Sequence, residues 1–278
     1  MRTTKLLMSM TLAAALLLPA APALANHPVT VEGNCFGPGA GGTATGLQMS
    51  PVPPGSCGDF DGDGRIGVAE DADMDNNFGS INAAVTAVGN NGRITIVASG
   101  TFPESVRLVP TEGASIVLAA ARGVDANIDA VVQGQAGNAE RQQQPGIFIG
   151  GCAACRVAVR NLTIRNWDEG VLVRRYSRAL LDDLRVEGNL DFGVRVVDRS
   201  RVTVTDSTID ATGYRKDSTG VNRPDYGIGL RLSRDAYASV YQTTISNNFA
   251  AGLSAKRGHT RLQHVQLFGN HPNLELYG

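Results

Sequence analysis

A twelve-residue segment near the N-terminus, residues 59–70, has the side chains of a metal-binding loop. Carboxylates stand at its positions 1, 3, 5 and 12, and a glycine stands at position 6, where such a loop turns sharply. Calcium is a hard cation that takes about six to eight oxygen ligands, and this order of donors suits it. The predicted ligands are four carboxylates and one backbone carbonyl, from Asp59, Asp61, Asp63, Glu70 and Arg65. The alternative is an acidic turn exposed to solvent.

This segment resembles an EF-hand or dockerin-like calcium loop. Glycine and proline precede it, and Asp71, Asp73 and Asp75 follow it, so its flanks do not predict two amphipathic helices. We therefore expect calcium as a cofactor with a structural role, ordering the Gly/Pro-rich segment 26–79.

A second group of chemically active side chains lies in the C-terminal half, beside glycines that recur at regular spacing. Acids precede these glycines by two residues, bases follow them by four, and aromatic residues stand next to the acids. The acids are Asp168, Asp191 and Asp225, the bases are Arg174, Arg231 and Lys256, and the aromatics are Trp167, Phe192 and Tyr226. An insertion at residues 213–222 adds Tyr214 to the same place. Such a mixture suits an extracellular or cell-surface polysaccharide, because aromatic faces stack on sugar rings.

The same residues allow an enzymatic interpretation. A carboxylate would act as general base or hold calcium against a uronate, and Arg174 or Arg231 would neutralise the uronate carboxylate. The alternative is that these are solvated residues, since stacked columns arise whenever a repeat duplicates.

An internal repeat predicts the elements that position these residues. Five six-residue segments align, at residues 159–164, 181–186, 204–209, 240–245 and 262–267. Their last residues lie 22, 23, 36 and 22 residues apart, the longest interval holding the insertion. A period of about 20–30 residues without helical segments predicts a solenoid. Short strands joined at asparagine and glycine corners then make an all-β, single-stranded parallel β-helix of about eight turns, at residues 80–278.

Two further features belong to this fold. A polar residue follows each aligned segment and is expected to stack in register; these residues are Asn166, Asn189, Thr212, Asn248 and Asn270. Apolar residues at 81, 84, 85 and 88 have helical spacing and predict a short N-terminal helix that caps the first turn.

The repeat resembles the right-handed parallel β-helix proteins of the pectin lyase-like superfamily, from about Ser80 to Gly278. The segment Ile94–Glu104, which contains Gly-Thr-Phe-Pro-Glu, is similar to the first strand of pectinesterase-like chains. The resemblance implies the fold, but the catalytic motifs of polygalacturonases, pectinesterases and pectate lyases are not intact in this sequence. The superfamily also includes non-catalytic modules, so the function stays open.

The N-terminal 25 residues have the pattern of a signal peptide: a basic start, a short apolar stretch and a small-x-small cleavage site. We therefore expect a secreted or periplasmic protein, in which disulfides can form. Proximity in the sequence favours the pairs Cys35–Cys57 and Cys152–Cys155.

Composition narrows the function classes. The 278 residues include 33 glycines, only 5% aromatics, 18% charged residues and a net charge of −1, which predicts a turn-rich aliphatic fold and gives no bulk reason to expect nucleic acid. No segment after the leader is long and apolar enough to span a membrane. We expect polysaccharide recognition; the alternatives are a polysaccharide lyase or hydrolase, and a structural or adhesive module that forms homo-oligomers through its C-terminal end.

Overall fold

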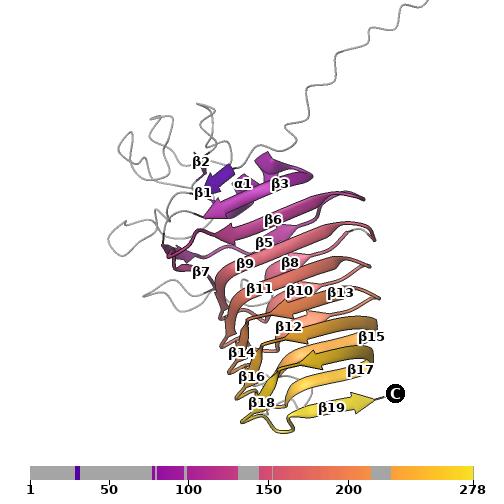
Figure 1. The fold of residues 1–278 in the computed structure, drawn as a ribbon. Coiled ribbons are helices and arrows are strands. Elements are labelled where there is room, and N and C mark those ends of the chain that lie inside the picture. Colours follow the sequence, from indigo (N-terminus) through magenta and orange to yellow (C-terminus); the bar gives the residue numbers. More distant parts are fainter. Residues whose placement is uncertain are drawn as a thin grey trace, which may run out of the picture.

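The computed structural model describes residues 29–31, 77–78, 80–96, 99–130, 144–151, 153–213 and 227–277. Over these residues the chain winds into an all-β solenoid of parallel strands, a right-handed parallel β-helix (Figure 1). Several sequence predictions fall outside this part of the chain and stay predictions. They are the leader 1–25, the calcium loop 59–70, and Cys35, Cys57, Cys152, Tyr214, Asp225 and Tyr226.

Strands from successive turns form three parallel stacks, which we number in chain order. Stack 1 consists of β3 (Asn91–Ile96), β6 (Ser115–Ala120), the first half of β9 (Arg156–Arg165), the first half of β11 (Arg178–Glu187), β13 (Arg201–Thr205) and the second halves of β15 (Ile228–Tyr241) and β17 (Ala251–Gln263).

Stack 2 consists of β4 (Gly100–Phe102), β7 (Ala126–Asp129), the second halves of β9 and β11, β14 (Thr208–Asp210), β16 (Thr244–Ser246) and β18 (Gln266–Phe268). Its register pairs Ile164, Val186, Ile209, Ile245 and Leu267 in succession. These are the last residues of the five aligned sequence segments, so the predicted repeat is confirmed residue by residue.

Stack 3 consists of β5 (Val106–Leu108), β8 (Pro145–Ile149), β10 (Glu169–Val173), β12 (Phe192–Val196), the first halves of β15 and β17, and β19 (Leu274–Tyr277). Each stack therefore has one strand in each of seven turns of the described chain, where about eight turns were expected. The short strands β1 (Val29–Val31) and β2 (Asn77–Phe78) pair with each other, and β1 also pairs with β3 at the N-terminal end.

Single residues in the left-handed backbone region turn the chain from stack 1 to stack 2. They are Asn161, Asp183, Asp206, Gln242 and His264, with φ between 45° and 54°. Asparagine and aspartate tolerate this conformation better than other non-glycine residues, which explains their frequency at these positions. At this corner, in five successive turns, one left-handed residue lets the inward side chains of both stacks meet in one core.

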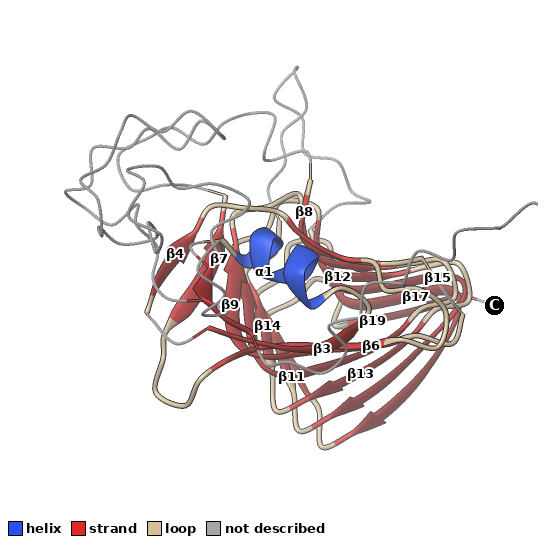
Figure 2. Ribbon diagram, turned by 90° about the horizontal axis from the view of Figure 1, so that it is seen from above, coloured by secondary structure: helices blue, strands red, loops and turns tan. Residues whose placement is uncertain are grey.

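The interior is aliphatic and is closed at the N-terminal end by the helix α1 (Ile81–Val88), which lies across the opening in Figure 2. Ile81 and Ala84 are fully buried on its inner face. The carboxylate of Glu104 accepts hydrogen bonds from the backbone amides of Ile81 and Asn82, at 2.7 and 3.0 Å, and thereby caps the helix N-terminus. The predicted capping helix is confirmed.

Buried side chains between stacks 2 and 3 form a hydrogen-bonded ladder. The side-chain amides of Asn189, Asn248 and Asn270 donate to the carbonyls of Ile164, Ile209 and Ile245 in the preceding turns, and the backbone amides of Trp167, Thr212 and Asn248 donate to their side-chain oxygens. The predicted stacking of asparagines is confirmed for these three residues.

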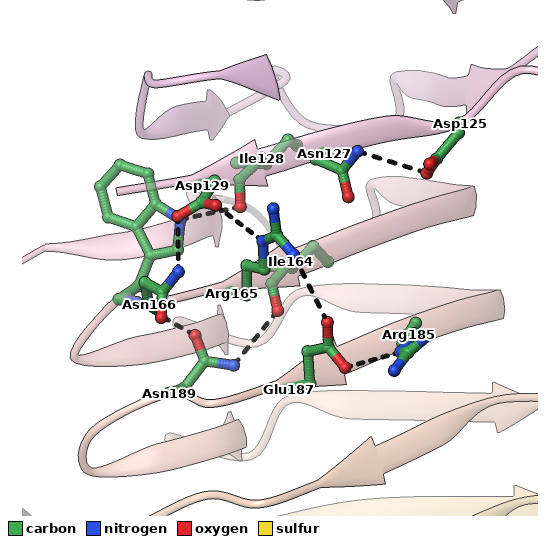
Figure 3. Close-up of polar contacts among 11 residues, drawn as sticks. Asp125, Asn127, Ile128, Asp129, Ile164, Arg165, Asn166, Arg185, Glu187 and Asn189 are labelled. Atoms are coloured by element: carbon green, nitrogen blue, oxygen red, sulfur yellow. Dashed lines mark hydrogen bonds and ion pairs between the residues drawn. The ribbon is translucent and has the colours of Figure 1, made fainter. Parts of the chain in front are cut away.

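Two residues depart from the prediction at this ladder. Trp167, not Asn166, occupies the ladder position of its turn, and its indole N–H donates to the carbonyl of Ile128 at 3.0 Å (Figure 3). Trp167 has no exposed surface, so its expected role in stacking on a sugar is wrong. A Cβ on Gly146 would lie 2.7 Å from the indole Cδ1, which explains why a glycine faces this ring. Asn166 instead donates to Asp129 at 2.7 Å.

Candidate functional site

The register of stack 3 decides which predicted site residues lie together. β12 pairs with β15 so that Phe192 faces Ile228 and Arg195 faces Arg231. Gly229 is therefore the counterpart of Gly170, Gly193 and Gly252, because each of these four glycines would place a Cβ against the buried ladder residue of the next turn. The sequence alignment used Gly227, which lies two residues earlier in its turn.

This shift breaks the predicted acidic column. Asp168 and Asp191 are neighbours, since the backbone N–H of Asp191 donates to the carbonyl of Asp168 at 2.7 Å. The next position of the column is Gly227, whose N–H donates to the carbonyl of Asp191. The structure therefore confirms neighbouring positions for Asp168 and Asp191 only, and Asp225 itself lies outside the described residues. Asp168 and Asp191 are only 8% and 7% exposed, so the pair is largely buried.

The predicted basic column is also divided. Arg174 and Lys256 do share a column, which runs through Val197 and Ser233. Arg231 belongs to the neighbouring column instead. Arg174 lies 3.7 Å from a carboxylate oxygen of Asp198, and Lys256 is exposed.

The column that contains Arg231 runs along the outer face of stack 3. Its members in order are Arg107, Phe148, Leu172, Arg195, Arg231, Ser254 and Glu275. The guanidinium of Arg107 lies 4.7 Å from the ring centre of Phe148, and Arg231 donates to the hydroxyl of Ser254 at 2.5 Å.

Arg195 is the most fully positioned cation of this face. Its guanidinium lies 5.0 Å from the ring centre of Phe192 and donates to a carboxylate oxygen of Glu169 at 2.6 Å. Phe192 is only 7% exposed, and its ring contacts the guanidinium of Arg195. Its structural role is therefore to support Arg195, in place of the direct contact with a sugar that the sequence predicted. The second carboxylate oxygen of Glu169 is buried and has no hydrogen-bond partner among the described residues.

A groove that the sequence analysis missed lies at the corner between stacks 1 and 2. It encloses about 220 Å³ and is lined by polar residues from successive turns, including Asp125, Asn161, Asp183, Arg185 and Asp206. The signal was present in the sequence, because Asn161, Asp183 and Asp206 hold the third position of their aligned segments. In the described part of the chain, no cluster of three or more His, Cys, Asp or Glu side chains is placed to hold a metal ion.

Two further sequence predictions concern the cysteines and membrane-spanning segments. Cys155 is fully buried, and because Cys152 lies outside the described residues their pairing stays a prediction. Among the residues placed in the structure, no helix has the length and apolarity to cross a membrane.

The three parallel stacks, the left-handed corners and the buried ladder define the class of the protein as a right-handed parallel β-helix. The chain belongs to the right-handed β-helix family, whose model, the right handed beta helix region, matches residues 127–267. Neither the curated proteins nor the solved structures contain a match to the chain. The narrower resemblance to the pectin lyase-like superfamily stays a prediction.

Proposed function

We propose that this protein is exported and binds an extracellular or cell-surface polysaccharide along the outer face of stack 3. The observation that carries this proposal is the row of partly exposed guanidinium groups from Arg107, Arg195 and Arg231 in one register column. Guanidinium groups bind carboxylates through two parallel hydrogen bonds. A polysaccharide that carries uronate carboxylates is therefore the ligand that fits this face best.

The surroundings of the row support a preformed binding surface. Glu169 and Phe192 fix the guanidinium of Arg195 on two sides, which lowers the entropy that binding must remove. Leu172 lies between Phe148 and Arg195 in the same column and offers apolar surface to the face of a sugar ring. Lys256 in the adjacent column adds a further exposed cation.

The binding test compares Arg195→Gln and Arg231→Gln with Arg122→Gln, which removes an exposed arginine outside this face. We expect the first two variants to bind polygalacturonate about tenfold more weakly, because each loses a charge-assisted contact of about 1.5 kcal/mol, and the control to bind like wild type. Calorimetry on polygalacturonate and on neutral dextran measures this. Unchanged affinity in both variants would refute the proposal. If Arg195→Gln does not fold, the affinity of Arg231→Gln still decides the result. Release of unsaturated uronate from the same samples would show a catalytic face instead.

Calcium bound by the loop 59–70 is the second part of the proposal, with a stabilising role. Ligands that bind only the folded state raise stability by mass action. We expect a chelator to lower the melting temperature of wild type and to leave an Asp61→Asn variant unchanged. If neither a chelator nor added calcium changes the melting temperature of wild type, the calcium part of the proposal is refuted and the polysaccharide part is not affected.

A further inference from the structure

The outer face of stack 1 carries a column of arginines that plays no part in the site on stack 3. Arg156, Arg178 and Arg201 occupy the same register position in β9, β11 and β13, and Tyr237 and His259 continue the column in β15 and β17. We call these five residues the arginine ladder. Neighbouring strands lie about 4.8 Å apart, so the ladder repeats its side chains at that interval along the solenoid axis.

Ring contacts hold the C-terminal half of the ladder. The guanidinium of Arg201 lies 5.2 Å from the ring centre of Tyr237, and the rings of Tyr237 and His259 stack with centres 4.7 Å apart and planes inclined by 21°. Tyr237, which is 41% exposed, thus has an interacting neighbour in the turn before it and in the turn after it. Arg201, Tyr237 and His259 therefore stack on one another at this end of the ladder.

Within the described chain, the ladder arginines have no acidic partners. Arg156, Arg178 and Arg201 are exposed, and none of them makes an ion pair with another described residue. Among the outward positions of stack 1, Asp182 is the one acid, and it lies 3.5 Å from Arg160. The chain as a whole has a net charge of −1, so the overall composition does not explain this excess of cations. The excess arises because the fold brings these arginines together on one face.

We propose that the arginine ladder binds a linear acidic polysaccharide, separately from the face on stack 3, so that one molecule can hold two polymer chains. A straight row of cations at the strand interval is complementary to a polyanion whose charged units follow one another along the solenoid axis. The proposal goes beyond binding at stack 3 and shares no residue with it.

Two observations favour a polysaccharide over a nucleic acid. Single-stranded nucleic acids bind through open aromatic faces on which bases stack, whereas the Tyr237 ring already interacts with Arg201 and stacks on His259. Duplex DNA is read by an element that enters a groove, whereas the ladder lies across the strands of a wide, continuous sheet.

The test counts binding sites on the full chain with a labelled oligogalacturonate. Wild type is expected to bind two oligomers and to cross-link long polygalacturonate, which light scattering detects. The double variant Arg178→Gln/Arg201→Gln is expected to bind one oligomer and to lose cross-linking. The matched control Arg122→Gln/Arg234→Gln removes two exposed arginines outside both faces and is expected to behave as wild type.

The outcomes separate the two proposals. If the stack 3 proposal fails, Arg195→Gln and Arg231→Gln leave binding unchanged while the ladder variant still loses a site of its own. Unchanged stoichiometry and cross-linking in the ladder variant would overturn the inference. Tighter binding of oligo(dT), or of vesicles containing anionic lipid, that is lost in the same variant would overturn the choice of polysaccharide.

Discussion

The outer faces of stacks 1 and 2 meet at one corner of the solenoid, and their arginines have different surroundings. On stack 2, Arg165 lies 2.6 Å from Asp129 and 3.8 Å from Glu187, and Glu187 also contacts Arg185 at 2.6 Å (Figure 3). On stack 1, the ladder arginines have no such partners within the described chain. Both stacks consist of parallel strands in register, so the difference in charge pairing comes from their side chains.

This comparison separates charges that stabilise the fold from charges that are available to a ligand. A buried carboxylate such as Asp129, which is 3% exposed, is tolerated only with its partners in place. Exposed like charges in register raise the energy of the folded state instead. A row of such charges in a folded protein therefore indicates a binding role more strongly than a structural one.

The largest expected effect is on stack 2, in Asp129→Ala. This variant leaves the guanidinium of Arg165 and the side-chain amide of Asn166 without their acceptor, and we expect a loss of about 3 kcal/mol in the free energy of unfolding. Urea titration measures it. The control is Asp210→Ala on the same stack, where only Ser246 and Asn247 lose a hydrogen bond, and about 1 kcal/mol is expected. An equal loss of unfolding free energy in the two variants would show that the Asp129–Arg165 ion pair contributes no more than ordinary hydrogen bonds.

A smaller effect is expected in Glu187→Gln. Glu187 is more exposed than Asp129, with 20% of its side chain accessible, and its two contacts lie closer to solvent. We expect a loss of about 1 kcal/mol that shrinks as salt is added, because salt screens partly exposed pairs. Thermal unfolding at low and high ionic strength tests this. A loss that is independent of salt would show that hydrogen bonding, and not charge, dominates this network.

The smallest effect, and one of opposite sign, is expected on stack 1 in Arg178→Gln. Arg156 and Arg201 flank Arg178 in register, so removing the central charge relieves repulsion on both sides. We expect a gain of about 0.5 kcal/mol at low ionic strength that vanishes near 1 M salt, where the Debye length falls to about 3 Å. Chemical denaturation at the two salt concentrations measures the gain. Destabilisation at both would mean that the ladder is a structural stack, and the contrast with stack 2 would fail.

Much of the fold could be predicted from the sequence, because inward positions of a solenoid repeat with the chain. The last residues of the aligned segments, from Ile164 to Leu267, are core residues that stack on one another, and their spacing alone predicts the register of stack 2. The helix before the first turn follows from its apolar spacing. These features depend on a local period, which the sequence records directly.

The errors at the candidate site have a local cause. Gly227 and Gly229 lie two residues apart, and both precede an apolar residue, so alternation cannot tell which one faces the core. Only the pairing of β12 with β15 shows that Gly229 is the counterpart of Gly193. The same pairing places Arg231 in the column of Arg195. In the same way Asn166 and Trp167 are adjacent, and only the burial of the indole against Ile128 assigns the ladder position.

By itself, the sequence determined that this protein is a parallel β-helix with a capped start, stacked asparagines and a repeat of about 22 residues. The tertiary structure decided which outward side chains become neighbours. Residues of one outer column lie a full turn apart in the chain, and solvent-facing positions have no common residue type that would reveal their register. The arginine ladder on stack 1, the paired charges on stack 2 and the guanidinium row on stack 3 therefore become visible only when successive turns are stacked.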